Sequence, residues 1–121
     1  MRHLLLIVFL LFLVSCATQK PQPDAFADAE QAIETAVNAG AEQHSPVELR
    51  FAREKLAEAQ KGMDYKQYDK AIYLLEQSEI NADLAFEKTR AAILRGKVTD
   101  LSRENEVLRE DFENTYGEVI E

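Results

Sequence analysis

Residues 45–77 have the sequence SPVELRFAREKLAEAQKGMDYKQYDKAIYLLEQ, which predicts two consecutive helices joined by a short turn. Ser45 is suited to the N-cap of the first helix, and Pro46 to the next position, where no backbone N–H is needed. Glu48, three residues after Ser45, is placed to complete a capping box. Apolar residues then recur at spacings of three and four along one helical face: Leu49, Ala52, Leu56, Ala59 and Met63.

The second helix of this pair is predicted to begin between Lys66 and Asp69. Gly62 predicts the end of the first helix near Lys61, because glycine is common just beyond a helix C-terminus. A connection this short places the two helices side by side and antiparallel. We expect the second helix to continue through Gly96, since an interior glycine weakens a helix without necessarily breaking it. Its predicted apolar face consists of Tyr68, Ala71, Ile72, Leu75, Ala82, Ala85, Phe86 and Ile93.

A further helix is predicted before this pair, over residues 24–38. Asp24 is suited to cap its first turn, and Gly40 supplies its end. Its apolar face consists of Phe26, Ala29, Ile33, Ala36 and Val37. All three prolines precede position 47, and no segment alternates in the manner of a strand. We therefore expect an all-α fold in which residues 24–95 form an antiparallel helical hairpin or three-helix bundle.

Residues 96–121 are predicted to form an acidic C-terminal helix of coiled-coil character. Positions spaced alternately by four and three residues are Leu94, Val98, Leu101, Asn105, Leu108, Phe112, Thr115 and Val119. If Val98 is heptad position a, Asn105 is the next a, where asparagine specifies register in parallel dimers. Glu104 then occupies g and Arg109 the following e, which pair between two parallel chains.

This C-terminal helix has more than one interpretation. Its repeat predicts a homodimer through residues 94–119, with an interaction stripe made of Val98, Leu101, Asn105, Leu108 and Phe112. Alternatively, the helix packs back on its own bundle or remains solvated. Residues 100–121 contain eight acidic and two basic residues, so charge repulsion opposes a homodimer, and a partner with a basic surface also fits.

The first fifteen residues are typical of a secretory signal peptide. Arg2 precedes an uninterrupted apolar run, LLLIVFLLFLV, at residues 4–14. At about 1.5 Å per residue this run spans only about half of a ~30 Å hydrocarbon core, so it is too short to cross a membrane as a helix. We expect residues 1–15 to be removed.

The end of that run, Leu13-Val14-Ser15-Cys16, resembles the lipobox of bacterial lipoproteins. The resemblance implies that Cys16 receives a diacylglyceryl group and, after cleavage, becomes the acylated N-terminus. Two or more acyl chains hold a protein firmly in a membrane. No cofactor is expected besides this covalent lipid. Residues 16–23 form a polar tether, and Ala17 after the cysteine resembles the pattern for sorting to the outer membrane, with the domain facing the periplasm.

Residue types needed for catalysis or metal binding do not cluster in the sequence. After removal of residues 1–15, His44 is the one histidine, so neither a Cys/His zinc site nor a Ser–His–Asp or Cys–His arrangement is predicted. A formal charge of -8 excludes a basic footprint for nucleic acid. We predict no enzyme and no metal site. Tyr65, Tyr68 and Tyr73 cluster near the predicted turn, either as an aromatic contact patch or as packing over the end of the bundle.

Residues 45–92 resemble a family of alanine-rich bacterial lipoprotein domains, domain-of-unknown-function family 4398. The residues that show the resemblance are Pro46, Leu49, Ala52, Lys55, Leu56, Ala59, Tyr68, Ala71, Leu75, Glu76, Gln77, Ala82, Asp83, Leu84 and Ala85. The resemblance covers residues 24–92 and implies a role in the cell envelope without an activity. We therefore expect a non-catalytic scaffold or adaptor with an envelope protein as partner. The alternative is a lipid- or glycan-binding protein with a groove lined by Phe26, Phe51 or the three tyrosines.

Overall fold

The computed structural model describes residues 20–117, which contain helices and no strand. The helices are α2 (Pro23–Asn38), α3 (Ala41–His44), α4 (Pro46–Asp64) and α5 (Tyr68–Tyr116). α5 has 49 residues and is uninterrupted at Gly96, which makes it about 70 Å long at 1.5 Å per residue. The predicted all-α class is confirmed, as is the continuous helix through Gly96.

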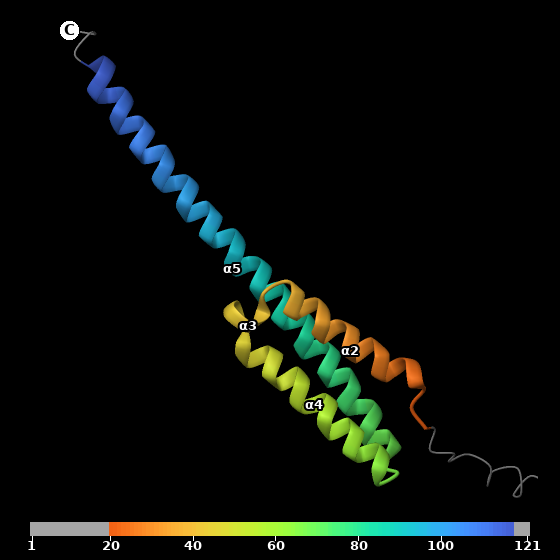
Figure 1. Ribbon diagram of the computed structural model, residues 1–121. Helices are drawn as coiled ribbons and strands as arrows, with labels where there is room; N and C mark the ends of the chain where they lie inside the picture. The colour runs from red at the N-terminus through yellow and green to blue at the C-terminus, as the bar shows by residue number, and fades with distance from the viewer. Residues whose placement is uncertain (1–19, 118–121) are drawn as a thin grey trace, which may run out of the picture.

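α2 and α4 pack along the first half of α5 (Figure 1). α4 runs antiparallel to α5, whereas α2 runs parallel to it, so α2 begins beside the turn that joins α4 to α5 (Figure 1). Contacts are most extensive between α4 and α5, fewer between α2 and α5, and fewest among the three pairs between α2 and α4. The C-terminal part of α5 continues alone beyond the other helices (Figure 1). We call residues 94–116 the projecting segment; all of their side chains are exposed.

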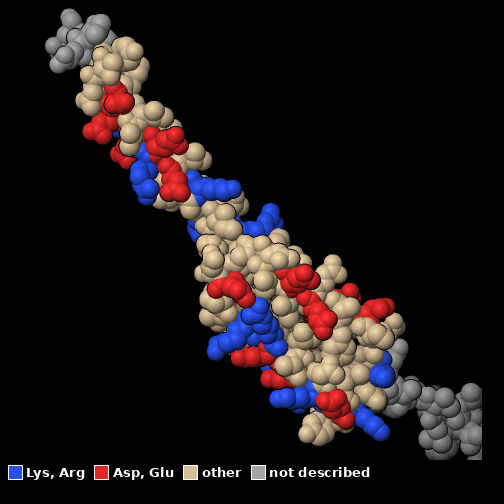
Figure 2. Space-filling view, in the orientation of Figure 1, with Lys and Arg blue, Asp and Glu red and all other residues tan. Residues whose placement is uncertain are grey.

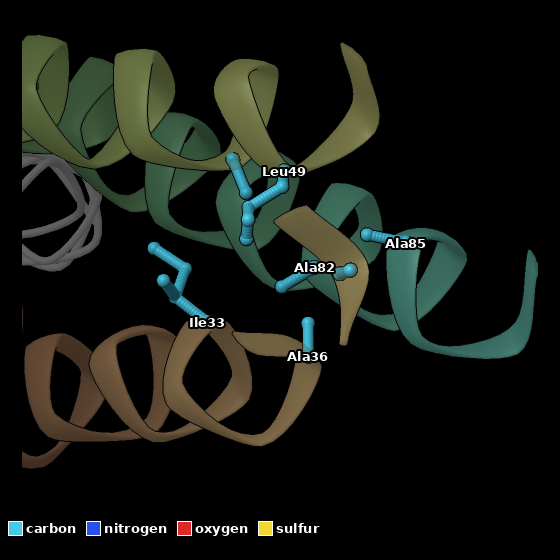
Figure 3. Packing of buried hydrophobic residues seen from close by; sticks show 7 residues of the cluster. Ile33, Ala36, Leu49, Ala82 and Ala85 are labelled. Atoms are coloured by element: carbon cyan, nitrogen blue, oxygen red, sulfur yellow. The ribbon is translucent and has the colours of Figure 1, made fainter. Parts of the chain in front are cut away.

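The core is built mainly from small side chains. Figure 3 shows Ile33 and Ala36 of α2 pointing toward Leu49 of α4 and Ala82 of α5. Because alanine side chains are short, they let helix axes approach at the short end of the usual 8–10 Å range. The buried apolar residues are Ala29, Ile33, Ala36, Ala41, Leu49, Ala52, Ala59, Ala71, Leu74, Leu75, Ala82 and Ala85.

The start of α4 differs from its prediction. Ser45 occupies the N-cap position, but its side chain makes no capping hydrogen bond. Instead, the Thr89 hydroxyl donates to Ser45 Oγ at 3.3 Å, with both side chains buried. Glu48 accepts a hydrogen bond from Lys88 Nζ. The predicted capping box is therefore wrong. The Ser45 and Glu48 side chains instead bond to Thr89 and Lys88 of α5.

Two other helix ends and one connection also differ from the sequence prediction. Gly62 does not end α4, which continues to Asp64. Asp24 lies in the first turn of α2, whose N-cap is Gln22. The connection before Ser45 contains the single-turn helix α3, which follows Gly40 at a φ of 97°, a left-handed conformation that glycine adopts without steric cost.

Candidate functional site

The buried face of α5 follows a seven-residue repeat. Two heptad positions supply most of its buried residues: Ala71, Ser78 and Ala85 at one, and Leu75, Ala82 and Thr89 at the other. Polar members of this face bond to α4. The Ser78 hydroxyl donates to the Ala52 carbonyl oxygen at 2.8 Å in a buried hydrogen bond. The side of α5 that faces α2 and α4 is thus fully occupied along the packed region.

Although Val107 and Tyr116 are exposed elsewhere on the helix, most exposed apolar residues of α5 occupy two other positions of the same repeat. We call this set the outer stripe: Tyr73, Ile80, Leu84, Leu94, Val98, Leu101, Asn105, Leu108 and Phe112. Its apolar members range in exposure from 44% at Leu84 to 64% at Leu101. Between Tyr73 and Phe112, three further residues share these two positions but are not counted in the outer stripe. Ala91 is half-buried, and Gln77 and Glu87 are polar residues that interrupt the apolar run in the packed region. The outer stripe therefore runs along the packed region as well as the projecting segment.

The predicted interaction stripe lies wholly on the projecting segment. Val98, Leu101, Leu108 and Phe112 are each 62–64% exposed, and Asn105 lies exposed among them. α5 does not fold back on its own bundle, so that alternative is wrong for residues 94–116. Sequence reasoning missed the continuation of this stripe to Tyr73. Tyr73 and Ile80 keep the same seven-residue spacing as Leu94 and Leu101, but this spacing alone does not show that they are exposed.

Electrostatic contacts do little to stabilise the projecting segment. Its ion pairs are intrahelical and exposed, with Arg103 Nη1 3.4 Å from Asp100 Oδ1 and Arg109 Nε 3.6 Å from Glu113 Oε1. Figure 2 shows acidic side chains gathered over its far part. No basic residue lies in the last turn, where a positive charge would favourably meet the helix dipole. A partner on the outer stripe would supply the packing that this isolated helix lacks.

A second candidate site is an apolar groove between α2 and α4, with a volume of about 410 Å³. The groove is open because both helices pack more extensively on α5 than on each other. Its lining is apolar at Phe26, Ile33, Val37, Leu56 and Ala57, and polar at Glu30, Glu34, Arg53 and Gln60. Phe51 lies outside it, 41% exposed, with the Arg50 guanidinium 5.3 Å from the centre of its ring.

A sequence profile described as "Domain of unknown function (DUF4398)" matches residues 24–101. The chain belongs to the DUF4398 family. The match covers α2, α3, α4 and the packed part of α5, and it extends to Leu101 in the projecting segment. No curated protein and no solved structure matches the chain.

In this DUF4398 protein the three predicted tyrosines are divided between different surfaces. Tyr65 is 76% exposed and lines a depression beside the α4–α5 turn, and Tyr68 lines another. Tyr73 belongs to the outer stripe and is 59% exposed. His44 is exposed at the end of α3. The three tyrosines therefore do not line one common depression.

Two carboxyl groups of the packed region have shifted pKa values. The hydrogen bond from Lys88 lowers the pKa of Glu48 below its ordinary value. Partial burial raises the pKa of Glu79, and the nearby carboxylates of Asp28, Asp83 and Glu76 raise it further. Shifts of this kind occur at catalytic sites and in structural ion pairs alike.

Other predicted features of the DUF4398 chain concern its anchor and its ligands. Leu13, Val14, Ser15 and Cys16 lie outside the described residues. Within residues 20–117, no helix is both long and apolar enough to span a membrane. In the same part of the chain, no three His, Cys, Asp or Glu side chains are grouped as a metal site would require.

Proposed function

We propose that this protein is a lipoprotein of the outer membrane, anchored through Cys16 and facing the periplasm, that acts as a non-catalytic scaffold or adaptor. In this proposal residues 24–95 form a bundle of three helices, in which consecutive helices run antiparallel. Residues 96–121 form a coiled-coil arm. The observation that supports it is the placement of the two ends: α2 begins at the end of the packed region opposite the one from which the projecting segment leaves (Figure 1).

This placement separates an anchor from an interaction surface. A lipid on Cys16 would hold the start of α2 near the membrane through the tether of residues 16–23. The projecting segment, roughly 35 Å long at 1.5 Å per residue, would then extend away from that membrane. Its exposed apolar residues are available to an envelope protein because no other part of the described chain covers them.

The anchor is tested with Cys16→Ala in the full chain. The variant should lose incorporation of labelled palmitate and keep residues 1–15 attached, because lipidation precedes cleavage in the lipoproteins that this motif resembles. Thr18→Ala, in the tether, is the matched control and should be processed normally. Normal labelling and cleavage of Cys16→Ala would overturn the proposed anchor.

The scaffold role is tested by placing a photo-crosslinking residue at Leu101 in cells. Arg103, two positions away on the opposite side of the helix from the outer stripe, is the control position. Crosslinks to a protein from Leu101 and not from Arg103 would support the proposal. Purified protein that modifies an envelope substrate, with the activity abolished by one point substitution, would overturn the non-catalytic role.

The groove between α2 and α4 supports a second candidate function, the binding of a lipid or glycan. A cavity of about 410 Å³ is within the range of small-ligand sites, and its apolar lining suits an acyl chain. Native mass spectrometry of the purified protein would detect such a ligand. Ala57→Phe should displace it, because Ala57 lines the groove, whereas Ala27→Phe on the exposed side of α2 should not.

A further inference from the structure

We infer that the outer stripe binds a second copy of this chain, with the two α5 helices parallel and in register along both the packed region and the projecting segment. This inference rests on the proposed function, since it names the partner of the same surface. It goes further in extending the contact back along α5 to Tyr73 and in fixing the orientation of the two chains.

The residues of α5 are divided between two faces. Its buried residues and its outer stripe occupy different positions of one seven-residue repeat. A second α5 can therefore approach the outer stripe without displacing α2 or α4. A strict seven-residue spacing is also the pattern that keeps two helices in contact as they supercoil, because 3.6 residues per turn would otherwise move the stripe around the helix.

The position of Asn105 bears on the orientation of the two chains. It is the polar residue of the outer stripe within the projecting segment, and it has apolar neighbours at Leu101 and Leu108. The polar interruptions Gln77 and Glu87 lie in the packed region, where Glu87 faces Glu87 of the second copy and opposes the contact locally. In a parallel, in-register pair, Asn105 faces Asn105 of the second copy, so each amide gains a hydrogen-bonding partner. In an antiparallel pair it would face a residue of the other heptad position, and opposite Leu94, Leu101 or Leu108 it would lose its bonds to water without replacement. Asn105 therefore favours the parallel arrangement.

Charged residues flank the outer stripe along α5. Glu104 and Arg109 occupy the positions that pair between parallel chains. Asp83 and Lys88 occupy the equivalent positions in the packed region, where Lys88 already donates to Glu48 of α4. Arg90 and Arg95 form one repulsive pair of the same type. Glu106, Glu110 and Glu113, which add to the negative charge of the projecting segment, lie on the side of α5 opposite the outer stripe. Much of the acidity therefore lies away from the contact, which weakens its opposition to a homodimer.

Single-cysteine crosslinking of the full chain in membranes tests this inference. Ile80→Cys in the packed region and Leu101→Cys in the projecting segment share one heptad position and are exposed. Both should give a disulfide-linked dimer under mild oxidation. Arg103→Cys, on the side of α5 opposite the outer stripe, and Ala27→Cys on α2 are the controls. The unsubstituted chain reports any dimer formed through Cys16.

Dimers at both Ile80→Cys and Leu101→Cys require parallel chains in register. These positions lie about 30 Å apart along the helix, so an antiparallel pair can bring only one of them to its own copy. A dimer at Leu101→Cys alone, or equal amounts at Leu101→Cys and Arg103→Cys, would overturn the inference. Coexpression of two differently tagged copies identifies both chains of the product.

The same design separates this inference from the proposed scaffold role. A photo-crosslinking residue at Leu101 that captures another protein and never a second copy would overturn the homodimer and leave the scaffold standing. Capture of neither another protein nor a second copy, from Ile80 or from Leu101, would contradict both.

Discussion

Gly62 of α4 packs directly on Ala71 of α5: a β-carbon added at Gly62 would lie 3.3 Å from the Ala71 β-carbon. Gly62 is buried, and Ala71 is fully buried. This contact lies close to the α4–α5 turn, where the chain reverses between Asp64 and Tyr68. Small residues here let the two helices come together immediately after the turn, so the glycine serves helix packing and does not end the helix.

Gly62→Val should therefore destabilise the fold by about 1–3 kcal/mol, the usual cost of overpacking a close contact. Gly96→Val is the matched control, because nothing lies within 4 Å of a β-carbon at that position. Both substitutions place valine inside a helix, so their difference isolates the steric clash. Urea unfolding followed by circular dichroism measures it, and equal stability of the two variants would contradict the close packing.

The alanine core predicts a second stability effect. Ala82 is fully buried among residues of α2 and α4, so Ala82→Leu should separate the helices and cost about 1–3 kcal/mol. Ala27→Leu, on the exposed side of α2, provides the same substitution without the clash and should change stability little. Thermal unfolding of both variants checks this, and an unchanged midpoint for Ala82→Leu would show that the core tolerates a larger side chain.

Periodicity alone predicted much of this core. Leu49, Ala52 and Ala59 were placed on the apolar face of one helix, and the structure buries all three. Ser78 and Thr89 were missed because polar residues do not register as core positions in a hydrophobic pattern. They become acceptable only where the partner helix offers an oxygen, as the Ala52 carbonyl does for Ser78. Such a partner is a tertiary feature that a single sequence does not specify.

The interaction surface was predicted in part, for a different reason. Most apolar residues of the projecting segment lie on the outer stripe, with Val107 and Tyr116 outside it, so Val98 and Leu101 were identified from spacing. In the packed region apolar residues lie on both sides of α5, and spacing does not say which side α2 and α4 cover. Tyr73 and Ile80 were left out of the stripe because only the packing shows that their side remains exposed.

Asn105→Leu should change the oligomeric state if two α5 helices meet at the outer stripe. Loss of the paired amides removes the feature that favours two parallel strands, so larger or mixed assemblies should form. Sedimentation velocity of the protein in detergent, over a range of concentrations, measures this. Ser102→Leu, which also adds a leucine to the exposed segment beside the stripe, is the control for nonspecific association.

Glu48 should stabilise the fold at neutral pH and lose this contribution in acid. Lys88 lowers the pKa of Glu48 in the folded state below the value of 4.5 expected in the unfolded chain. The contribution is therefore fully present above about pH 4.5 and disappears as the pH falls through the lower, folded-state pKa. Glu48→Gln should be less stable than the parent at pH 7 and should approach it in acid, as measured by urea unfolding at a series of pH values. Glu54→Gln, in an exposed pair with Arg50 on the same helix, should show a smaller difference.

Glu79 should have the opposite effect on stability. Partial burial, together with Asp28 on α2 and Asp83 and Glu76 on α5, raises its pKa in the folded state above 4.5. The folded protein therefore binds this proton more tightly than the unfolded chain, so ionised Glu79 destabilises the fold at neutral pH. That cost is relieved as the pH falls through the raised pKa toward 4.5.

Glu79→Gln removes the charge and keeps the shape of the side chain, so it should raise the free energy of unfolding at pH 7. The gain should shrink as the pH falls and vanish near pH 4, where the parent carboxyl group is protonated in both states. Urea unfolding at the two pH values measures the change, with Glu106→Gln on the exposed projecting segment as the control. A gain of equal size at pH 7 and pH 4 would show that the effect arises from packing, because a charge effect must disappear once the carboxyl group is neutral.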